Sequence, residues 1–386
     1  MPPCFSILIT LLVFLFWSPF STAAEGPGFP NVDYLPGQEG SVLSLNDYGK
    51  ALSAMTMHRG YLFVPLGADH GGGRGAGAFA LYDISDPTNV VEHFDTRRHG
   101  SVYNDRNSIN YVGNFAEVHH MCASGNLMMI TERRSGSSGF CFLDLSNIYD
   151  DDPATLPQIV GRYSYPGLNT NTNYDGWAFA AGMQGTKYHW GPTGANGLFV
   201  VDTSDITNPQ LVTHLPTSQL NNNIMNAAVP IGNLLILSSS AVSSSFDAIV
   251  MDISDPANPQ ILNTFNGPLG YQGFTYGSKF YGGGEPLRSH DFSNPQNIVT
   301  TTLERRPNFD RSEYGFGKDN HIFIGHYPGM TKWEISGNTA TRIVDVNSGI
   351  VDDHAFITPL GNLIALSSDH NNGRRMIFGI HDQKRA

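Results

Sequence analysis

Cysteine, basic charge and long apolar runs are all scarce in this sequence, and each scarcity excludes a class of protein. Three cysteines occur among 386 residues, and Cys4 lies within the predicted signal peptide described below, so a framework of disulfide bonds is excluded. Acidic residues outnumber basic ones by 34 to 22, which gives a formal net charge of -12. We therefore expect no nucleic-acid partner, because phosphate binding requires a basic field.

One apolar run stands out, at the N-terminus. It extends from Phe5 to Trp17, too short to span a bilayer reliably, and small residues follow it up to Ala23 and Ala24. This pattern predicts a signal peptide at 1-24, although the start carries no Lys or Arg, and a signal anchor is the alternative. We expect a secreted or periplasmic protein with no membrane span after signal removal. An N-terminal extension would occupy 25-40 and a single domain 41-386.

What the chain has in abundance is glycine (42), proline (23) and aromatic residues (11%). These are typical of short strands joined by tight turns. A degenerate repeat runs through the chain: a strand that ends in Asp, then Ile-Ser-Asp-Pro-x-Asn-Pro, then a further strand. Its copies begin at Phe79 (FALYDISDP), Phe142 (FLDLSN), Phe199 (FVVDTSDITNP), Ile249 (IVMDISDPANP), Ser289 (SHDFSNP), Lys332 (KWEISG) and Met376 (MIFGIH).

A second motif, strand–Gly turn–strand, precedes each copy. Pro230 to Leu237 (PIGNLLIL) and Pro359 to Leu366 (PLGNLIAL) are almost identical. Each unit is therefore expected to contain four antiparallel strands, a to d, which is the size of a propeller blade. No helical periodicity competes after the signal. The sequence predicts an all-β fold, a seven-bladed β-propeller of four-stranded antiparallel blades. Ser41 to Asn46 would supply the outer strand that the last unit lacks, so that the ring is closed by an N-terminal strand.

The repeat also resembles a known family. Leu198-Phe199-Val200-Val201-Asp202, followed by Asn208-Pro209-Gln210-Leu211-Val212, is similar to the repeat of the LVIVD-repeat β-propeller family. The resemblance covers most of the chain from about Ala51 to Ile380. It implies the propeller fold and an exported or surface location, and it implies no particular activity, because the repeat residues occupy turn and core positions.

On this strand map, Cys122 and Cys141 lie on strands separated by a third strand. That spacing is unfavourable for a disulfide bond, so we expect two small, buried, unpaired residues.

The topology separates two faces of the ring. The turn face carries the a–b and c–d turns, which the repeat explains. The loop face carries the long b–c and d–a connections, where functional residues are most often found. Arginine and histidine concentrate on the connections of the loop face. Arg forms planar paired contacts with acidic groups and His titrates near neutrality, so this composition predicts a ligand or active site.

His119 is the preferred candidate for a catalytic base, with Glu117 on the same side of its strand to orient it. His120 faces the other way, and the alternative interpretation for this residue is a structural role in the core. Arg133 or Arg134 would neutralise an acidic group, and Tyr188 or His189 would donate a proton. His189 and Trp190 are expected to end the b strand of the third blade. The predicted ligand-binding residues are His70, Arg74, His99, Tyr174, Asp175, Tyr271, Arg311, His326, Asp353, His354 and His370. His290 occupies a core position and is expected to be structural.

Two functions remain open. The first is a secreted enzyme of the lyase, isomerase or cyclase class, which abstracts a proton from an acidic glycan or another small molecule in an Arg/His-rich axial pocket. Several exported propellers with only the fold in common are polysaccharide lyases. The alternative is a non-catalytic module that binds a glycan or a protein. The sequence requires no cofactor. It contains no zinc-type spacing, but a divalent metal ion stays open. It also suggests a monomer.

Overall fold

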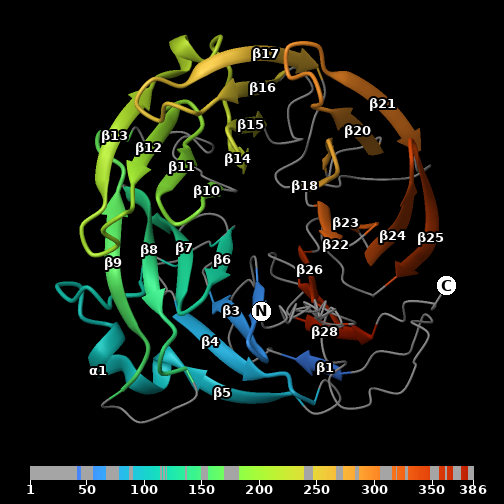
Figure 1. Ribbon diagram of the computed structural model, residues 1–386. Helices are drawn as coiled ribbons and strands as arrows, with labels where there is room; N and C mark the ends of the chain where they lie inside the picture. The colour runs from blue at the N-terminus through green and yellow to red at the C-terminus, as the bar shows by residue number, and fades with distance from the viewer. Residues whose placement is uncertain are drawn as a thin grey trace, which may run out of the picture.

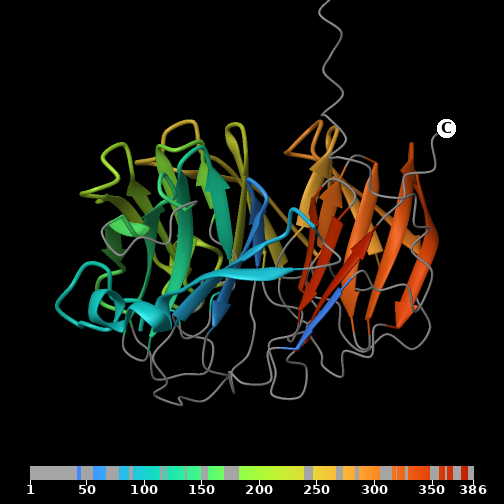
Figure 2. The same ribbon diagram turned by 90° about the horizontal axis from the view of Figure 1, so that it is seen from below.

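A computed structural model of the protein provides the description of the fold. It describes residues 41–44, 55–66, 78–86, 90–113, 115, 118, 120–134, 137–148, 155–168, 182–238, 247–266, 273–282, 287–304, 315–318, 320–326, 329–347, 356–360, 363–367 and 375–380. Within these residues the chain forms four-stranded antiparallel sheets that follow one another around a common axis (Figure 1). Seen from the side, the strands run between the two faces of the ring (Figure 2).

Six blades each contain four consecutive strands, numbered from the axis outward. The first and second blades are β2 (Thr56–His58), β3 (Tyr61–Leu66), β4 (Ala78–Asp83), β5 (Val91–Asp95) and β6 (Met121–Ser124), β7 (Leu127–Arg134), β8 (Ser137–Asp144), β9 (Gln158–Ser164). The third and fourth are β10 (Gly182–Gln184), β11 (Tyr188–Pro192), β12 (Leu198–Asp202), β13 (Gln210–Leu215) and β14 (Ala227–Ile231), β15 (Leu234–Ser238), β16 (Asp247–Asp252), β17 (Gln260–Asn266). The fifth and sixth are β18 (Gly273–Tyr276), β19 (Lys279–Gly282), β20 (Leu287–Asp291), β21 (Val299–Glu304) and β22 (Gly315–Lys318), β23 (His321–His326), β24 (Gly329–Ser336), β25 (Thr339–Asn347).

A further sheet joins strands from the two ends of the chain, in the order β1-β28-β27-β26. We call it the terminal sheet. Its strands are β1 (Ser41–Ser44), β26 (Phe356–Leu360), β27 (Leu363–Ser367) and β28 (Arg375–Ile380). The pairing of β1 with β28 is antiparallel and places Ser41 opposite Phe378 and Ser44 opposite Arg375. Strand β26 contacts β22 of the sixth blade and β2 of the first.

The repeated Asp ends the third strand of a blade and builds the turn that follows. In the third blade, Asp202 Oδ1 accepts a hydrogen bond of 2.8 Å from the backbone N–H of Ser204. Asp83, Asp144, Asp252 and Asp291 make the same bond to the residue two positions on. These short Asp turns explain why the motif recurs without any functional requirement.

The residue after that Asp, or after Glu334 in the sixth blade, ties the two turns of each blade together. Its N–H donates to a carbonyl of the a–b turn at 2.7–3.0 Å in all six consecutive-strand blades, and its side chain is buried or nearly so. The residues that do this are Ile84, Leu145, Thr203, Ile253, Phe292 and Ile335. The apolar residue of the Ile-Ser-Asp-Pro motif is therefore a core position as well as a turn position.

Each outer strand carries an irregularity in its pairing with the third strand. In five of the six consecutive-strand blades the register shifts between the two residues that precede the terminal acidic residue, as at Val200/Val201 and Val250/Met251. In the fifth blade the shift lies two residues earlier, at Leu287/Arg288. Such bulges twist an exposed edge strand and discourage pairing with other chains.

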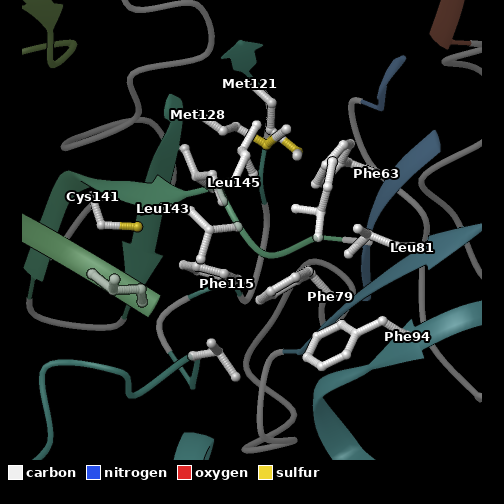
Figure 3. Packing of buried hydrophobic residues seen from close by; sticks show 14 of the residues in the cluster. Phe63, Phe79, Leu81, Phe94, Phe115, Met121, Met128, Cys141, Leu143 and Leu145 are labelled. Carbon is white, nitrogen blue, oxygen red and sulfur yellow. The ribbon is translucent and has the colours of Figure 1, made fainter. Parts of the chain in front are cut away.

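The core lies in the seams between neighbouring blades. Between the first and second blades, Phe79 and Phe94 pack with Phe115, Met121 and Leu143 (Figure 3). The connection from β5 to β6 contributes to this seam through η2 (Thr96–His99) and α1 (Gly100–Tyr103). A third short helix, η3 (Thr217–Gln219), follows β13. These helices are too short to carry helical periodicity, so the sequence did not indicate them.

The β5–β6 connection also covers the outer edge of the second blade. The Tyr103 hydroxyl donates to Pro157 O at 2.6 Å, and Asn110 Oδ1 accepts from the N–H of Ile159 at 2.8 Å. Ile159 is buried as a result, whereas Leu211, the residue at the same place in the third blade, is 44% exposed. This connection is thus a structural clamp between two blades.

Cys122 and Cys141 lie on β6 and β8, with β7 between them, and both are free. Burial raises the pKa of the Cys122 thiol to about 12. Among the described residues, no helix is long and apolar enough to cross a membrane.

Candidate functional site

Most of the residues predicted to form a site on the loop face lie outside the described residues. These are Glu117, His119, His70, Arg74, Tyr174, Asp175, Tyr271, Arg311, Asp353, His354 and His370. Arg133, Arg134 and His326 are described in their backbone, and they lie in strands rather than in the predicted b–c loops, because β7 and β23 are longer than the sequence indicated. Their roles stay predictions.

Tyr188 lies at the opposite end of its strand from the predicted position. It is the first residue of β11 and pairs with Asp202, where the turns of the turn face begin. The ammonium group of Lys187 lies 5.0 Å from the centre of its ring. The sequence placed the end of this strand at Trp190, but β11 continues through Pro192, so its first residues lie farther from the loop face.

His189, the next residue, is fully buried in the seam between the second and third blades. Its ring stacks on Phe140 of β8 with the ring centres 3.8 Å apart, and its Nε2 lies 2.7 Å from the hydroxyl of Tyr165. Its Nδ1 is buried and has no hydrogen-bond partner among the described residues. Burial, with a smaller contribution from the nearby His120, lowers the pKa of His189 to about 3. The imidazole is therefore neutral and joins two blades.

His120 precedes β6 and continues its pairing with β7. Its carbonyl accepts bonds from the backbone N–H and the hydroxyl of Thr131, at 3.1 and 3.0 Å. Its Nδ1 is also buried without a partner among the described residues, and burial lowers its pKa to about 4. This geometry favours the core role that the sequence left open for His120. His290 is likewise buried and bonds to Thr300 at 2.9 Å, as expected for a structural residue.

A buried ion pair lies in the second blade close to the loop face. Glu132 on β7 accepts from Arg162 on β9, with Oε1 3.0 Å from Nε and 2.9 Å from Nη2. Arg162 also donates to the carbonyl of Tyr111, in the β5–β6 connection. The Cys141 thiol lies beside both groups, and burial, followed by the charge of Glu132, raises its pKa. The thiol is protonated and inert as a nucleophile.

His99 is the last residue of η2, beside the first blade. Its ring stacks on Phe94 with centres 5.3 Å apart and planes 9° apart. Arg97 of the same turn forms an ion pair with Asp95. These contacts attach η2 to the outer strand β5, so this part of the predicted ligand-binding set has a structural use.

Sequence reasoning missed Tyr165 and the pair Glu132–Arg162. A signal for the pair was present, since Glu132 follows the apolar run LMMIT of a core strand. Tyr165 had no such signal, because its partner His189 comes from a different blade. Among the described residues, no group of three His, Cys, Asp or Glu side chains could hold a metal ion. The described polar groups are suited to holding blades together rather than to moving a substrate proton.

The ring of four-stranded antiparallel sheets defines this protein as a β-propeller. Solved structures support the fold. A chain in the crystal structure of the mitotic checkpoint complex matches with a TM-score of 0.56 at 10% identity, over 92% of this chain and 97% of that one. The structure of YCF48 bound to D1 peptide matches with a TM-score of 0.54 at 10% identity, over 93% and 100%.

The sequence narrows the class further. The LVIVD repeat matches residues 193–217 and 247–266, which contain the third and fourth strands of the third and fourth blades. Together with the propeller arrangement, this match supports an LVIVD-repeat β-propeller. No curated protein matches the sequence.

Proposed function

We propose that this propeller is a non-catalytic binding module that holds an extended segment of a partner protein on its loop face. The observation that carries the proposal is that the His189 side chain is buried in the packing between two blades. Among the predicted catalytic groups whose side chains are described, it is the proton-transferring group nearest the loop face, and its ring is enclosed between Phe140 and Tyr165. A proton donor that contacts no solvent cannot reach a substrate.

The comparisons add support of a general kind. YCF48 is a propeller of nearly the same extent and its structure contains a bound peptide, while the other similar chain belongs to a multiprotein complex. At 10% identity they indicate only that this fold suits protein recognition. A rigid ring with one face occupied by short turns leaves the opposite face for a partner.

The test is a binding screen of the purified full chain against a random peptide library, in parallel with an acidic glycan array. We expect saturable peptide binding that Arg133→Ala and Arg134→Ala weaken by tenfold or more. Arg59→Ala is the matched control, because Arg59 is an exposed arginine of the turn face that donates to Asn126. Its binding should equal that of the unaltered protein.

The same samples test the lyase hypothesis. Each glycan is incubated with the protein, and the ultraviolet absorbance of unsaturated uronate is followed. Formation of this product, with loss in His119→Ala, would overturn the binding module in favour of an enzyme. Peptide binding that persists in both arginine variants but is lost in Arg59→Ala would move the site to the turn face and contradict the proposal.

We further propose that the terminal sheet is a seventh blade, and that β1 closes the ring. The pairing of Ser41–Ser44 with Arg375–Phe378, and the contacts of β26 with β22 and β2, support this arrangement. Deletion of residues 41–44 should then lower the melting temperature by several degrees, because it exposes the edge of β28. Deletion of the preceding residues 36–39 is the control. Equal melting temperatures for both deletions would contradict closure.

We also propose that the protein is exported, with residues 1–24 removed as a signal peptide. The apolar run from Phe5 to Trp17 and the small residues after it support this. N-terminal sequencing of the protein from its native host should find a first residue near Glu25. A mature chain that begins at Met1 would contradict export by cleavage.

A further inference from the structure

The seam between the second and third blades is built around an unsatisfied imidazole. The ring of His189 stacks on Phe140, Tyr165 occupies its Nε2, and Tyr165 itself stacks on Phe199 at 5.0 Å. In either tautomer, the buried Nδ1 lacks a partner among the described residues. Buried polar atoms are rarely left unpaired, so each one marks a place where the packing is stressed.

The described charged and titratable groups around this seam offer no anion for a protonated His189. On β7 the carboxylate is Glu132, which already pairs with Arg162 of β9. On β8 the group is the protonated thiol of Cys141. The remaining groups are the phenols of Tyr163 and Tyr165, whose pKa values burial raises, the second neutral imidazole of His120, and Tyr188 with Lys187 on the third blade.

A proton on His189 would therefore be placed in a closed seam with no counter-charge from the described residues. The cost of such a charge is several times that of an unpaired neutral group. Water can hydrate the imidazolium once the two blades separate. Acid therefore favours the separated form, and a second proton on His120 acts in the same direction, because each charge repels the other.

We infer that this seam is an acid-sensitive latch, in which protonation of His189 releases Phe140 and Tyr165 of the second blade from the third. The inference concerns the ring itself and does not depend on the proposed binding function. At neutral pH the latch is closed. As pH falls, the second and third blades separate locally before the ring as a whole unfolds.

The direction and size of the effect follow from proton linkage. The pKa values of both histidines are lowered in the closed seam, to about 3 for His189 and about 4 for His120. In the open seam they would return to about 6.5. Stability of the closed form is thus complete above pH 6.5 and is lost as pH falls below it. Between pH 7.5 and 5.5, each histidine should favour opening about tenfold, and the two together about a hundredfold.

Hydrogen exchange followed by mass spectrometry tests this on the full chain. After correction for the intrinsic pH dependence of exchange, peptides that contain β8 and β11 should lose about a hundredfold in protection between pH 7.5 and 5.5. Peptides from β15 and β16 in the fourth blade serve as the internal reference and should change much less. Equal loss in both sets would indicate general unfolding and overturn the latch, as would no loss in β8 and β11.

Two variants assign the effect to His189. His189→Phe retains an aromatic ring for the stack on Phe140, and His189→Gln retains a hydrogen-bonding partner for Tyr165, so at least one should fold. Neither can titrate, and the pH effect should shrink from about a hundredfold to about tenfold. His214→Phe is the matched control: His214 stacks on Phe199 at 4.1 Å but is exposed. An undiminished pH effect in the folded His189 variants would contradict the inference.

Discussion

Replacing Arg162 by methionine would remove the paired cation from the buried carboxylate of Glu132, and the size of the effect can be worked from the structure. The Glu132 side chain is 4% exposed and loses both bonds, of 2.9 and 3.0 Å, in Arg162→Met. Removal of one partner from a buried ion pair costs about 3–5 kcal/mol. Arg162 is 18% exposed, so the lower end of that range, about 3 kcal/mol, is expected.

Glu132→Gln should cost less, about 1–2 kcal/mol, because an amide oxygen still accepts from Arg162 although the bond is no longer charge-assisted. The double variant should be no less stable than Arg162→Met alone, since no buried carboxylate then remains. Equilibrium unfolding in urea measures all three, and the cycle gives the coupling between the two side chains.

The pH dependence separates this explanation from simple loss of packing. A buried carboxylate that loses its paired arginine takes up a proton more readily, so the destabilisation of Arg162→Met should be smaller at pH 5.5 than at pH 8. It is measured as the difference from the unaltered protein at each pH. The reasoning is refuted if Arg162→Met at pH 8 unfolds within about 1 kcal/mol of the unaltered protein.

Three further predictions concern the blades and their turns. Gly161→Ala should destabilise by about 3 kcal/mol or more in urea unfolding, because its Cβ would lie 1.6 Å from Ile206 O of the next blade. Gly125→Ala, which meets no atom within 4 Å but has φ +59°, should cost only about 1 kcal/mol, and equal losses would argue against the close approach. Asp202→Ala should cost about 1 kcal/mol in thermal unfolding through loss of its turn bond, whereas Asp202→Asn should cost little. Burial, then a nearby arginine, lowers the pKa of His290 to about 4. The contribution of the neutral His290 to the free energy of unfolding, about 3 kcal/mol, is therefore complete above pH 6.5 and disappears towards pH 4. His290→Phe should flatten the acid side of the curve of stability against pH, and an unchanged curve would be inconsistent with the buried neutral form.

The extent of prediction from sequence differs between fold and site. The repeated Asp turn was sufficient to place the strands that contain Phe199 and Ile249 within a residue or two, because a turn is fixed by local hydrogen bonds. Strand ends without such a turn were less well predicted. The b strand that contains His189 was ended two residues early, and this alone moved Tyr188 to the wrong end of its blade.

Roles of individual histidines could not be predicted in the same way. His189 and His214 both lie on strands of the third blade, and both stack on a phenylalanine. One is fully buried with a strongly lowered pKa and the other is exposed. The difference arises from Phe140 and Tyr165, which belong to the second blade.

The sequence by itself determined the all-β fold, the four-stranded unit and the LVIVD-type repeat, because those depend on turns and alternations within about 50 residues. Only the tertiary structure decided what the polar residues do. Glu132 and Arg162 are 30 positions apart, and Tyr165 and His189 are 24 apart. Their partners are set by packing between strands and blades, a property that a linear pattern of residue types does not contain.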